Sequence, residues 1–199
     1  MELLLIRHGL PERAEADQGR RADPGLASQG WEQAEALAAW LDVAPPEHVY
    51  ASPMQRALDT ATPLAKRVGE EPTVRDGLAE YDRGANYYVP VEELRRSGDP
   101  RYQELIDDWT GPERRPDREA FRADVVRTID TIAGSHPSAR IAVVCHGGVI
   151  NAYLGTVLGI DQRLLFFSPA YTSITRVEWS QQGQRTMLSA NETGHLRRA

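Results

Sequence analysis

The sequence LLLIRHG, residues 3–9, is the part of the chain that indicates the fold most clearly. Its four consecutive aliphatic residues are typical of a buried strand, and Gly9 and Pro11 mark where that strand ends. Arg7 and His8 would then lie at the carboxyl end of the strand, which is where ligands bind in an open α/β sheet. A guanidinium suits a phosphate, and an imidazole can act as a nucleophile or as an acid and base near neutral pH. The stretch therefore predicts a reactive, anion-binding site at one strand end.

Segments typical of strands and helices alternate along the rest of the chain. Helices are expected from an N-cap at Ser28 to about Leu41, after Ser52-Pro53 to about Val68, from Asp117 onward, and over residues 149–158. Strands are expected over residues 48–51 and 141–145, with two closing strands over 172–179 and 185–190. This alternation predicts the α/β class, as a three-layer α/β/α sandwich in which helices flank a mostly parallel central sheet.

Residues 82–116 break this regular alternation. The segment is rich in glycine and proline and contains short helical stretches, such as residues 102–109. We interpret it as a lid inserted over the active site, within a single domain that spans residues 1–199. Its aromatic side chains and several arginines are expected to select the organic part of a substrate, and the aromatic residues are Tyr87, Tyr88, Tyr102 and Trp109.

Composition and charge narrow the class of protein. Lys and Arg number 23 against 29 Asp and Glu, and the resulting net charge of −6 argues against binding to nucleic acid or to an anionic membrane. The single cysteine cannot form a disulfide within the chain and fits a reducing compartment. Neither a membrane-spanning stretch nor a signal peptide is recognisable, so the expected location is the cytoplasm. No local cluster of Cys, His and Asp has the spacing of a metal site.

Other segments of the chain carry reactive or charged residues at comparable positions. The strand over 141–145 runs directly into HGG, residues 146–148, and then into a helix, whose first backbone N–H groups attract anions. Arg56 lies in the first turn of its expected helix, and Glu80 follows Leu78-Ala79. If the strands are parallel, the side chains of Arg7, His8, Arg56 and His146 could lie together around one phosphate-sized anion, and Glu80 would supply a carboxylate. The set provides a nucleophile, cations for the equatorial oxygens and an acid for the leaving oxygen, as phosphoryl transfer requires.

These segments resemble the histidine phosphatase superfamily, which includes the cofactor-dependent phosphoglycerate mutases. The similarity runs in order through nearly the whole chain, over residues 4–9, 26–34, 51–61, 78–84, 143–148 and 191–196. The resemblance implies a phosphoglycerate mutase-like fold and an enzyme that acts on phosphate esters. The sequence leaves a homodimer open, because two-fold assemblies are the commonest kind.

The resemblance also implies a role for each matching residue. His8 would be the nucleophile that becomes a phosphohistidine, and Glu80 would protonate the leaving alkoxide and then deprotonate water. Arg7, Arg56 and a protonated His146 would bind the phosphoryl group in place of a metal ion, so neither a metal nor a cofactor is expected. The expected substrate contacts are Arg7, Arg56, His146, Gly147 and Tyr87.

This chemistry sets physical requirements on two of the residues. His8 must be neutral, with its second ring nitrogen held by an acceptor such as a backbone carbonyl. Glu80 must keep a proton to donate, which requires a raised pKa. Other carboxylates nearby are alternative acids, and they are Asp76, Asp82, Glu92 and Glu93.

The residues after the first strand favour hydrolysis over transfer to a second substrate. After Arg-His-Gly, the mutases have an acidic residue and then a small hydroxyl residue, whereas this chain has Leu10-Pro11-Glu12-Arg13. The chain is also shorter than the mutases, which carry a larger insertion that excludes water. Because a site that admits water hydrolyses its phosphoenzyme, we expect a phosphomonoesterase of histidine acid phosphatase type that acts on a small phosphorylated metabolite. The alternatives are a cofactor-dependent phosphoglycerate mutase and a non-catalytic module that binds phosphate or a phosphoprotein.

Overall fold

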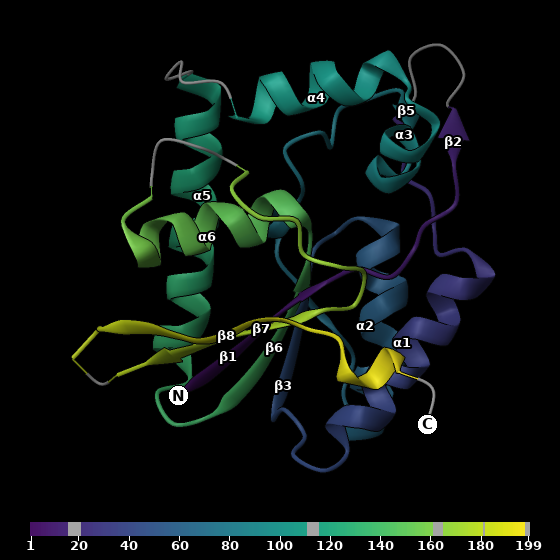
Figure 1. Cartoon of the computed structure of the whole chain (residues 1–199). Helices are drawn as coiled ribbons and strands as arrows, with labels where there is room; N and C mark the ends of the chain where they lie inside the picture. The colour runs from purple at the N-terminus through teal and green to yellow at the C-terminus, as the bar shows by residue number, and fades with distance from the viewer. Residues whose placement is uncertain (16–20, 111–115, 161–164, 181, 198–199) are drawn as a thin grey trace.

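A six-stranded sheet forms the centre of the molecule in the computed structural model, which describes residues 1–15, 21–110, 116–160, 165–180 and 182–197 (Figure 1). The strand order is β4-β3-β6-β1-β7-β8. The strands are β1 (Glu2–Arg7), β3 (His48–Ala51), β4 (Thr73–Val74), β6 (Arg140–Cys145), β7 (Ile174–Trp179) and β8 (Arg185–Glu192). The pairings among β4, β3, β6 and β1 are parallel, whereas β7 and β8 close the sheet as antiparallel strands.

Helices cover both faces of this sheet. They are α1 (Ser28–Leu41), α2 (Gln55–Val68), α3 (Val91–Ser97), α4 (Pro100–Thr110), α5 (Pro116–Ser135) and α6 (Gly147–Leu158), with short 3-10 turns at Asp76–Leu78 and Gly194–Leu196. Leu4 and Ile6 of β1 pack with α1 and α2, whereas Leu3 and Leu5 pack with α5 and α6. This alternation follows from the two-residue period of a strand. The expected three-layer α/β/α architecture with a mostly parallel sheet is therefore confirmed.

The start of α1 differs from the expectation that Ser28 caps it. The helix begins at Ser28, its N-cap is Ala27, and no side chain caps it. The N–H of Trp31 donates to the carbonyl of Ala27 at 3.0 Å, so the first helical hydrogen bond already belongs to Ala27. Gly30, which is buried in this first turn, lies so close to the backbone of Leu10 that a Cβ would overlap it. The helix start is thus fixed by close packing against the segment after β1.

The segment over 82–110 lies across the edge of the sheet at which β1, β3 and β6 end (Figure 1). It contains β5 (Tyr87–Tyr88), α3 and α4, and β5 pairs with β2 (Ala14–Glu15) in a separate two-stranded sheet. Residues 111–115, which complete the predicted lid, lie outside the described residues. No described helix is long and apolar enough to cross a membrane.

Candidate active site

The parallel pairing of β1 with β6 brings two histidines together. Arg7 lies opposite Cys145 in the register, so His8 and His146 leave the sheet side by side, with ring centroids 5.1 Å apart. Both side chains are buried, with 3% and 0% of their surface exposed. A buried imidazole needs a defined partner for its N–H, so the hydrogen bonds of each ring decide its protonation state.

His8 is held as a neutral ring with one nitrogen available. Its Nδ1 lies 2.8 Å from the carbonyl oxygen of Gly9, and since a carbonyl can only accept, Nδ1 carries the proton. The lone pair therefore lies on Nε2. Burial, followed by the charges of Arg56 and Arg7, holds the pKa of His8 well below its usual value. The backbone acceptor expected from the sequence is present.

His146 is also neutral in the unliganded site. Its Nε2 lies 2.7 Å from Oγ of Ser52, and its Nδ1 has no hydrogen-bond partner among the described residues. Burial and then the charges of Arg56, His8 and Arg7 keep its pKa well below the usual value. The protonated His146 that the resemblance implies, in contact with a phosphoryl group, stays a prediction.

Arg56, from the first turn of α2, is 1% exposed. Its terminal nitrogens lie 3.8 Å from Asp23 and 3.7 Å from Asp82, and its guanidinium lies 4.5 Å from the ring centroid of Tyr88. Nε and NH1 form no hydrogen bond within the described part of the chain. A buried guanidinium with donors to spare is suited to binding an anion.

Arg7 is joined to α3 through Glu92. Its NH1 donates to Oε1 of Glu92 at 2.5 Å and to the carbonyl of Pro169 at 2.7 Å, and its guanidinium lies 4.0 Å from the ring centroid of Tyr171. The hydroxyl of Tyr171 also donates to Glu92. Burial by itself would raise the pKa of Glu92. The charge of Arg7 and the hydrogen bonds from Arg7 and Tyr171 outweigh that effect, so the pKa of Glu92 is lowered. Glu92 is therefore a carboxylate that positions Arg7, and it is poorly suited to donate a proton.

Glu80 has the environment of a proton donor. It is 7% exposed, its Oε2 accepts from the N–H of Gly148 at 2.9 Å, and its Oε1 accepts from the N–H of Tyr81 at 2.9 Å. Burial, and then the charge of Asp82, raises the pKa of Glu80 to about 7. The expected upward shift of this pKa is present. Of the alternative acids, Asp82 and Glu92 line the same cavity, whereas Asp76 and Glu93 do not.

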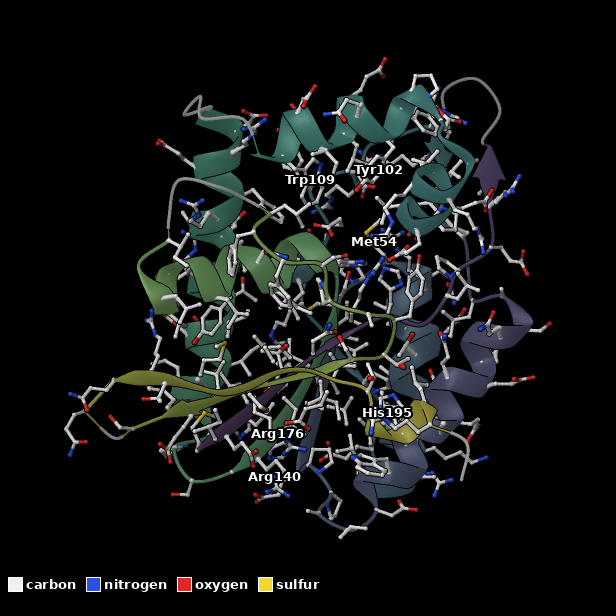
Figure 2. The ribbon with its side chains drawn as sticks, in the orientation of Figure 1. Met54, Tyr102, Trp109, Arg140, Arg176 and His195 are labelled. Carbon is white, nitrogen blue, oxygen red and sulfur yellow. The ribbon has the colours of Figure 1, made fainter. Side chains whose placement is uncertain are left out.

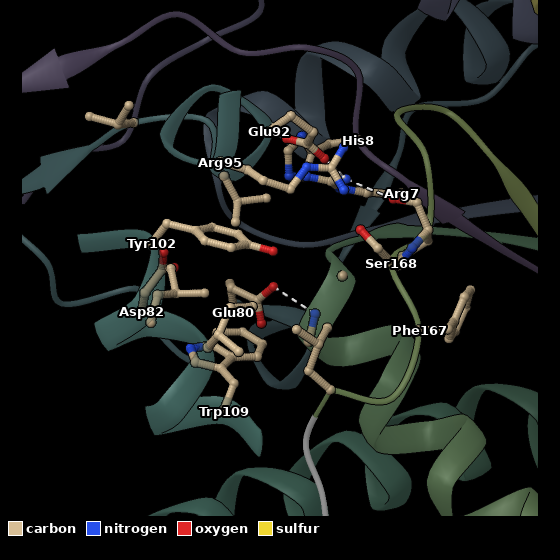
Figure 3. A pocket seen from close by; sticks show the side chains of 18 of the residues that line it. Arg7, His8, Glu80, Asp82, Glu92, Arg95, Tyr102, Trp109, Phe167 and Ser168 are labelled. Carbon is tan, nitrogen blue, oxygen red and sulfur yellow. Dashed lines mark hydrogen bonds and ion pairs between the residues drawn. The ribbon is translucent and has the colours of Figure 1, made fainter. Parts of the chain in front are cut away.

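These groups lie at the inner end of a cavity of about 420 Å³ (Figure 3). Five of the residues that the sequence predicts for the site line this cavity, namely Arg7, His8, Arg56, Glu80 and Gly147. His146 does not line it but lies next to His8. Figure 2 shows Tyr102 and Trp109 extending from α4 toward the body of the molecule. In the close-up of the cavity, both side chains face Glu80.

Tyr87 does not line this cavity, although the sequence predicted a substrate contact there. Neighbouring residues of a strand point to opposite sides, and β5 turns Tyr88 toward Arg56 and Tyr87 away from it. Tyr87 is 43% exposed, and the guanidinium of Arg101 lies 5.5 Å from its ring centroid. Tyr88 therefore takes the place that was expected for Tyr87.

The segment before β7 holds the end of β1 in position, and sequence reasoning missed it. Thr172 has a φ of +55°, which is unusual for a side chain with a branched Cβ. Its N–H lies 3.0 Å from the carbonyl oxygen of Arg7 and 3.3 Å from that of His8, and its Oγ1 lies 2.9 Å from Nε2 of His195. The strand expected from residue 172 begins only at Ile174, because Thr172 has a left-handed backbone conformation, and no sequence pattern predicts that its N–H would reach Arg7 and His8.

A family model for the histidine phosphatase superfamily (branch 1) matches residues 3–193. The chain belongs to the histidine phosphatase superfamily. A bifunctional protein of Mycobacterium tuberculosis is 30% identical over 204 residues, which cover 98% of this chain and 54% of that protein. This chain thus spans about half the length of that relative.

Two phosphatases are also similar to this member of the superfamily. A glucosyl-3-phosphoglycerate phosphatase of Mycolicibacterium vanbaalenii is 30% identical over 167 residues, which cover 79% of this chain and 74% of that protein. The solved structure of phosphoserine phosphatase from Entamoeba histolytica, in complex with 3-phosphoglyceric acid, has a TM-score of 0.75 and 24% identity. The match covers 98% of this chain and 99% of that one, and it confirms the phosphoglycerate mutase-like fold.

No group of three or more His, Cys, Asp or Glu side chains that could hold a metal ion occurs in the part of the chain that the structure describes. The cationic side chains in the wall of the cavity are those of Arg7, Arg56 and Arg95, and the rings of His8 and His146 lie beside one another next to them. The arrangement is suited to nucleophilic attack by an imidazole on phosphorus, followed by proton donation from a carboxylic acid.

Proposed function

We propose that the protein is a phosphomonoesterase that hydrolyses a small phosphorylated metabolite through a phosphohistidine on His8. The observation that carries this proposal is the neutral, buried ring of His8, whose Nδ1 is bound to Gly9 and whose Nε2 is available beside Arg7 and Arg56. An imidazole with a low pKa keeps its lone pair at neutral pH, and flanking guanidiniums stabilise the negative charge of the transferring phosphoryl group.

The first half of the proposed reaction phosphorylates His8. Nε2 attacks phosphorus, an N–P bond forms, and the bond from phosphorus to the ester oxygen breaks. The leaving alkoxide takes the proton from Glu80, whose pKa of about 7 keeps a large fraction protonated. Arg7 and Arg56 bind the phosphoryl oxygens, and the dianion raises the pKa of His146 enough for it to bind as a cation.

In the second half, the carboxylate of Glu80 removes a proton from water and the resulting hydroxide attacks phosphorus. The N–P bond breaks, His8 returns to its neutral state, and inorganic phosphate leaves. The same residue thus serves first as acid and then as base, and each cycle restores its proton. Pro11, which offers no N–H donor after the strand end, and the two phosphatases among the similar proteins support hydrolysis over the mutase reaction.

The proposal is tested with p-nitrophenyl phosphate under rapid acid- and base-quench. We expect phosphate release together with an acid-labile, base-stable phosphoprotein, which is the behaviour of a phosphohistidine. Turnover of 3-phosphoglycerate that depends on 2,3-bisphosphoglycerate would instead establish the mutase. Phosphate binding without any turnover would establish the non-catalytic module.

The raised pKa of Glu80 predicts the pH dependence of the rate. The value of kcat/KM for an alkyl phosphate is expected to fall by about tenfold per pH unit above pH ~7, because the protonated acid is the form that donates. His8 stays neutral over that range, since its pKa lies well below its usual value, and so it adds no loss there. A profile of kcat/KM that stays flat to about pH 9 would contradict the assignment of Glu80 as the acid.

A further inference from the structure

The apolar side of α4 faces the cavity. Tyr102, Leu105, Ile106 and Trp109 recur at positions i, i+3, i+4 and i+7 of this helix, and all of them line the cavity wall. Each of these side chains is only partly buried, although such a stripe is normally covered by other apolar groups. A ligand in the cavity would contact this apolar stripe.

The opposite wall of the cavity is also apolar. Phe166, Phe167 and Pro169 come from the segment before β7. Two further apolar residues line the cavity beside β5 and α3, and they are Val89 and Val91, the first residue of α3. Figure 3 shows Phe167 and Trp109 on opposite sides of the space in front of Glu80. We call the part of the cavity between α4 and residues 166–169 the outer chamber. The leaving group of a phosphate ester held at His8 would extend into it.

Two of the three acidic groups at the inner end already accept hydrogen bonds. Glu92 accepts from Arg7 and Tyr171, and Glu80 accepts from two backbone N–H groups. Asp82 lies 3.7 Å from Arg56, and its Oδ1 has no hydrogen-bond partner among the described residues. A polyhydroxylated leaving group could reach that one carboxylate, but it would place its other hydroxyls against the apolar walls, where they lose their hydrogen bonds to water without replacement.

Three further polar groups line the cavity. They are Arg95, Ser168 and the hydroxyl end of Tyr102, and Figure 3 shows Ser168 beside Arg7 and Arg95 beside Glu92. Arg95 is exposed, so a polar or anionic substituent of a substrate could remain in contact with water beside it.

We propose that the outer chamber selects phosphomonoesters whose alcohol is apolar next to the ester oxygen, such as an aryl-alkyl or alkyl alcohol, over sugar and amino-acid phosphates. This inference rests on the proposed phosphatase activity and names the substrate class of that same site. The burial of apolar surface provides the selectivity, because filling an apolar pocket changes kcat/KM by about tenfold or more.

The test compares esters whose leaving oxygens are alike. The compounds 2-phenylethyl phosphate, n-hexyl phosphate, glycerol 3-phosphate and glucose 6-phosphate all release a primary alkyl alcohol, so differences in leaving-group basicity are small. We expect kcat/KM to be at least about tenfold higher for the two apolar esters, mainly through a lower KM. Equal rates, or a preference for the polar esters or for phosphoserine, would overturn the proposal.

A matched pair of variants locates the effect. Leu105→Ser, in the outer chamber, is expected to reduce by about tenfold the ratio of kcat/KM for 2-phenylethyl phosphate to that for glycerol 3-phosphate. Leu188→Ser is the control, because Leu188 lies on β8 away from the cavity and is 54% exposed, and it should leave both rates unchanged. A ratio that is the same in Leu105→Ser as in the control would also overturn the proposal.

The outcomes separate this inference from the proposed function. If no ester is hydrolysed, p-nitrophenyl phosphate included, both fail together. If hydrolysis through a phosphoenzyme occurs but the polar esters are preferred, the phosphatase stands and the substrate class is wrong. Retained turnover of glycerol 3-phosphate by Leu105→Ser shows that this variant is folded.

Discussion

Replacing His8 by alanine is expected to lower phosphate release from any phosphomonoester by a factor of about 10⁴ or more. The physical reason is that the variant has no atom in the position of Nε2 to form the N–P bond, while Arg7 and Arg56 still bind the ester. The variant should therefore bind inorganic phosphate and yet form no acid-labile phosphoprotein. Stopped assays of phosphate release, together with isothermal titration with phosphate, measure both properties.

The matched control for this variant is His48→Ala. His48 lies at the start of β3, and its partly exposed ring contacts Glu70 and the ring of His136, away from the cavity. We expect this control to keep full activity and a similar melting temperature. Residual turnover of His8→Ala above about one hundredth of the wild-type rate would show that another group attacks phosphorus.

Replacing Glu80 by glutamine is expected to separate the two half-reactions. The amide oxygen can still accept from the N–H of Gly148, but the side chain no longer donates or accepts a catalytic proton. With an alkyl phosphate, kcat should fall by about 10²- to 10⁴-fold, because the alkoxide needs a proton to leave. With p-nitrophenyl phosphate, whose leaving oxygen needs none, phosphorylation should survive and the phosphohistidine should accumulate.

A burst of p-nitrophenol that matches the enzyme concentration, followed by a slow steady state, would be the signature of this variant. Asp82→Asn is the comparison, since Asp82 lines the same cavity and its pKa is also raised by burial. If Asp82→Asn shows the burst and Glu80→Gln does not, Asp82 is the acid. Wild-type behaviour with both ester types in Glu80→Gln would exclude Glu80 from either proton transfer.

The sequence was sufficient to predict the sheet and its strand ends, because those features depend on local patterns. Residues 3–7 and 141–145 read as buried strands, and their parallel pairing follows from the alternation with helices. The convergence of Arg7, His8, Arg56 and His146 then follows from topology. In such cases a short-range pattern determines a long-range arrangement.

Other features of the site depended on contacts that no local pattern encodes. The protonation of His146 is set by burial beside two guanidiniums, which only the folded structure brings together. The choice of Tyr88 over Tyr87 depends on which face of β5 turns inward, and a strand of two residues has no periodicity that could reveal it. The role of Glu92 as a partner of Arg7 likewise depends on the placement of α3 over the sheet edge.

Gly148 shows how little freedom the inner end of the site has for change. A Cβ at this position would overlap both Oε1 of Glu80 and the ring of Trp109, so the floor of the site, its acid and the lid meet with no space between them. Any larger residue at position 148 would have to displace Glu80 or move Trp109. A single glycine therefore sets how closely α4 approaches the start of α6, and a substitution there should disturb Glu80 and α4 together.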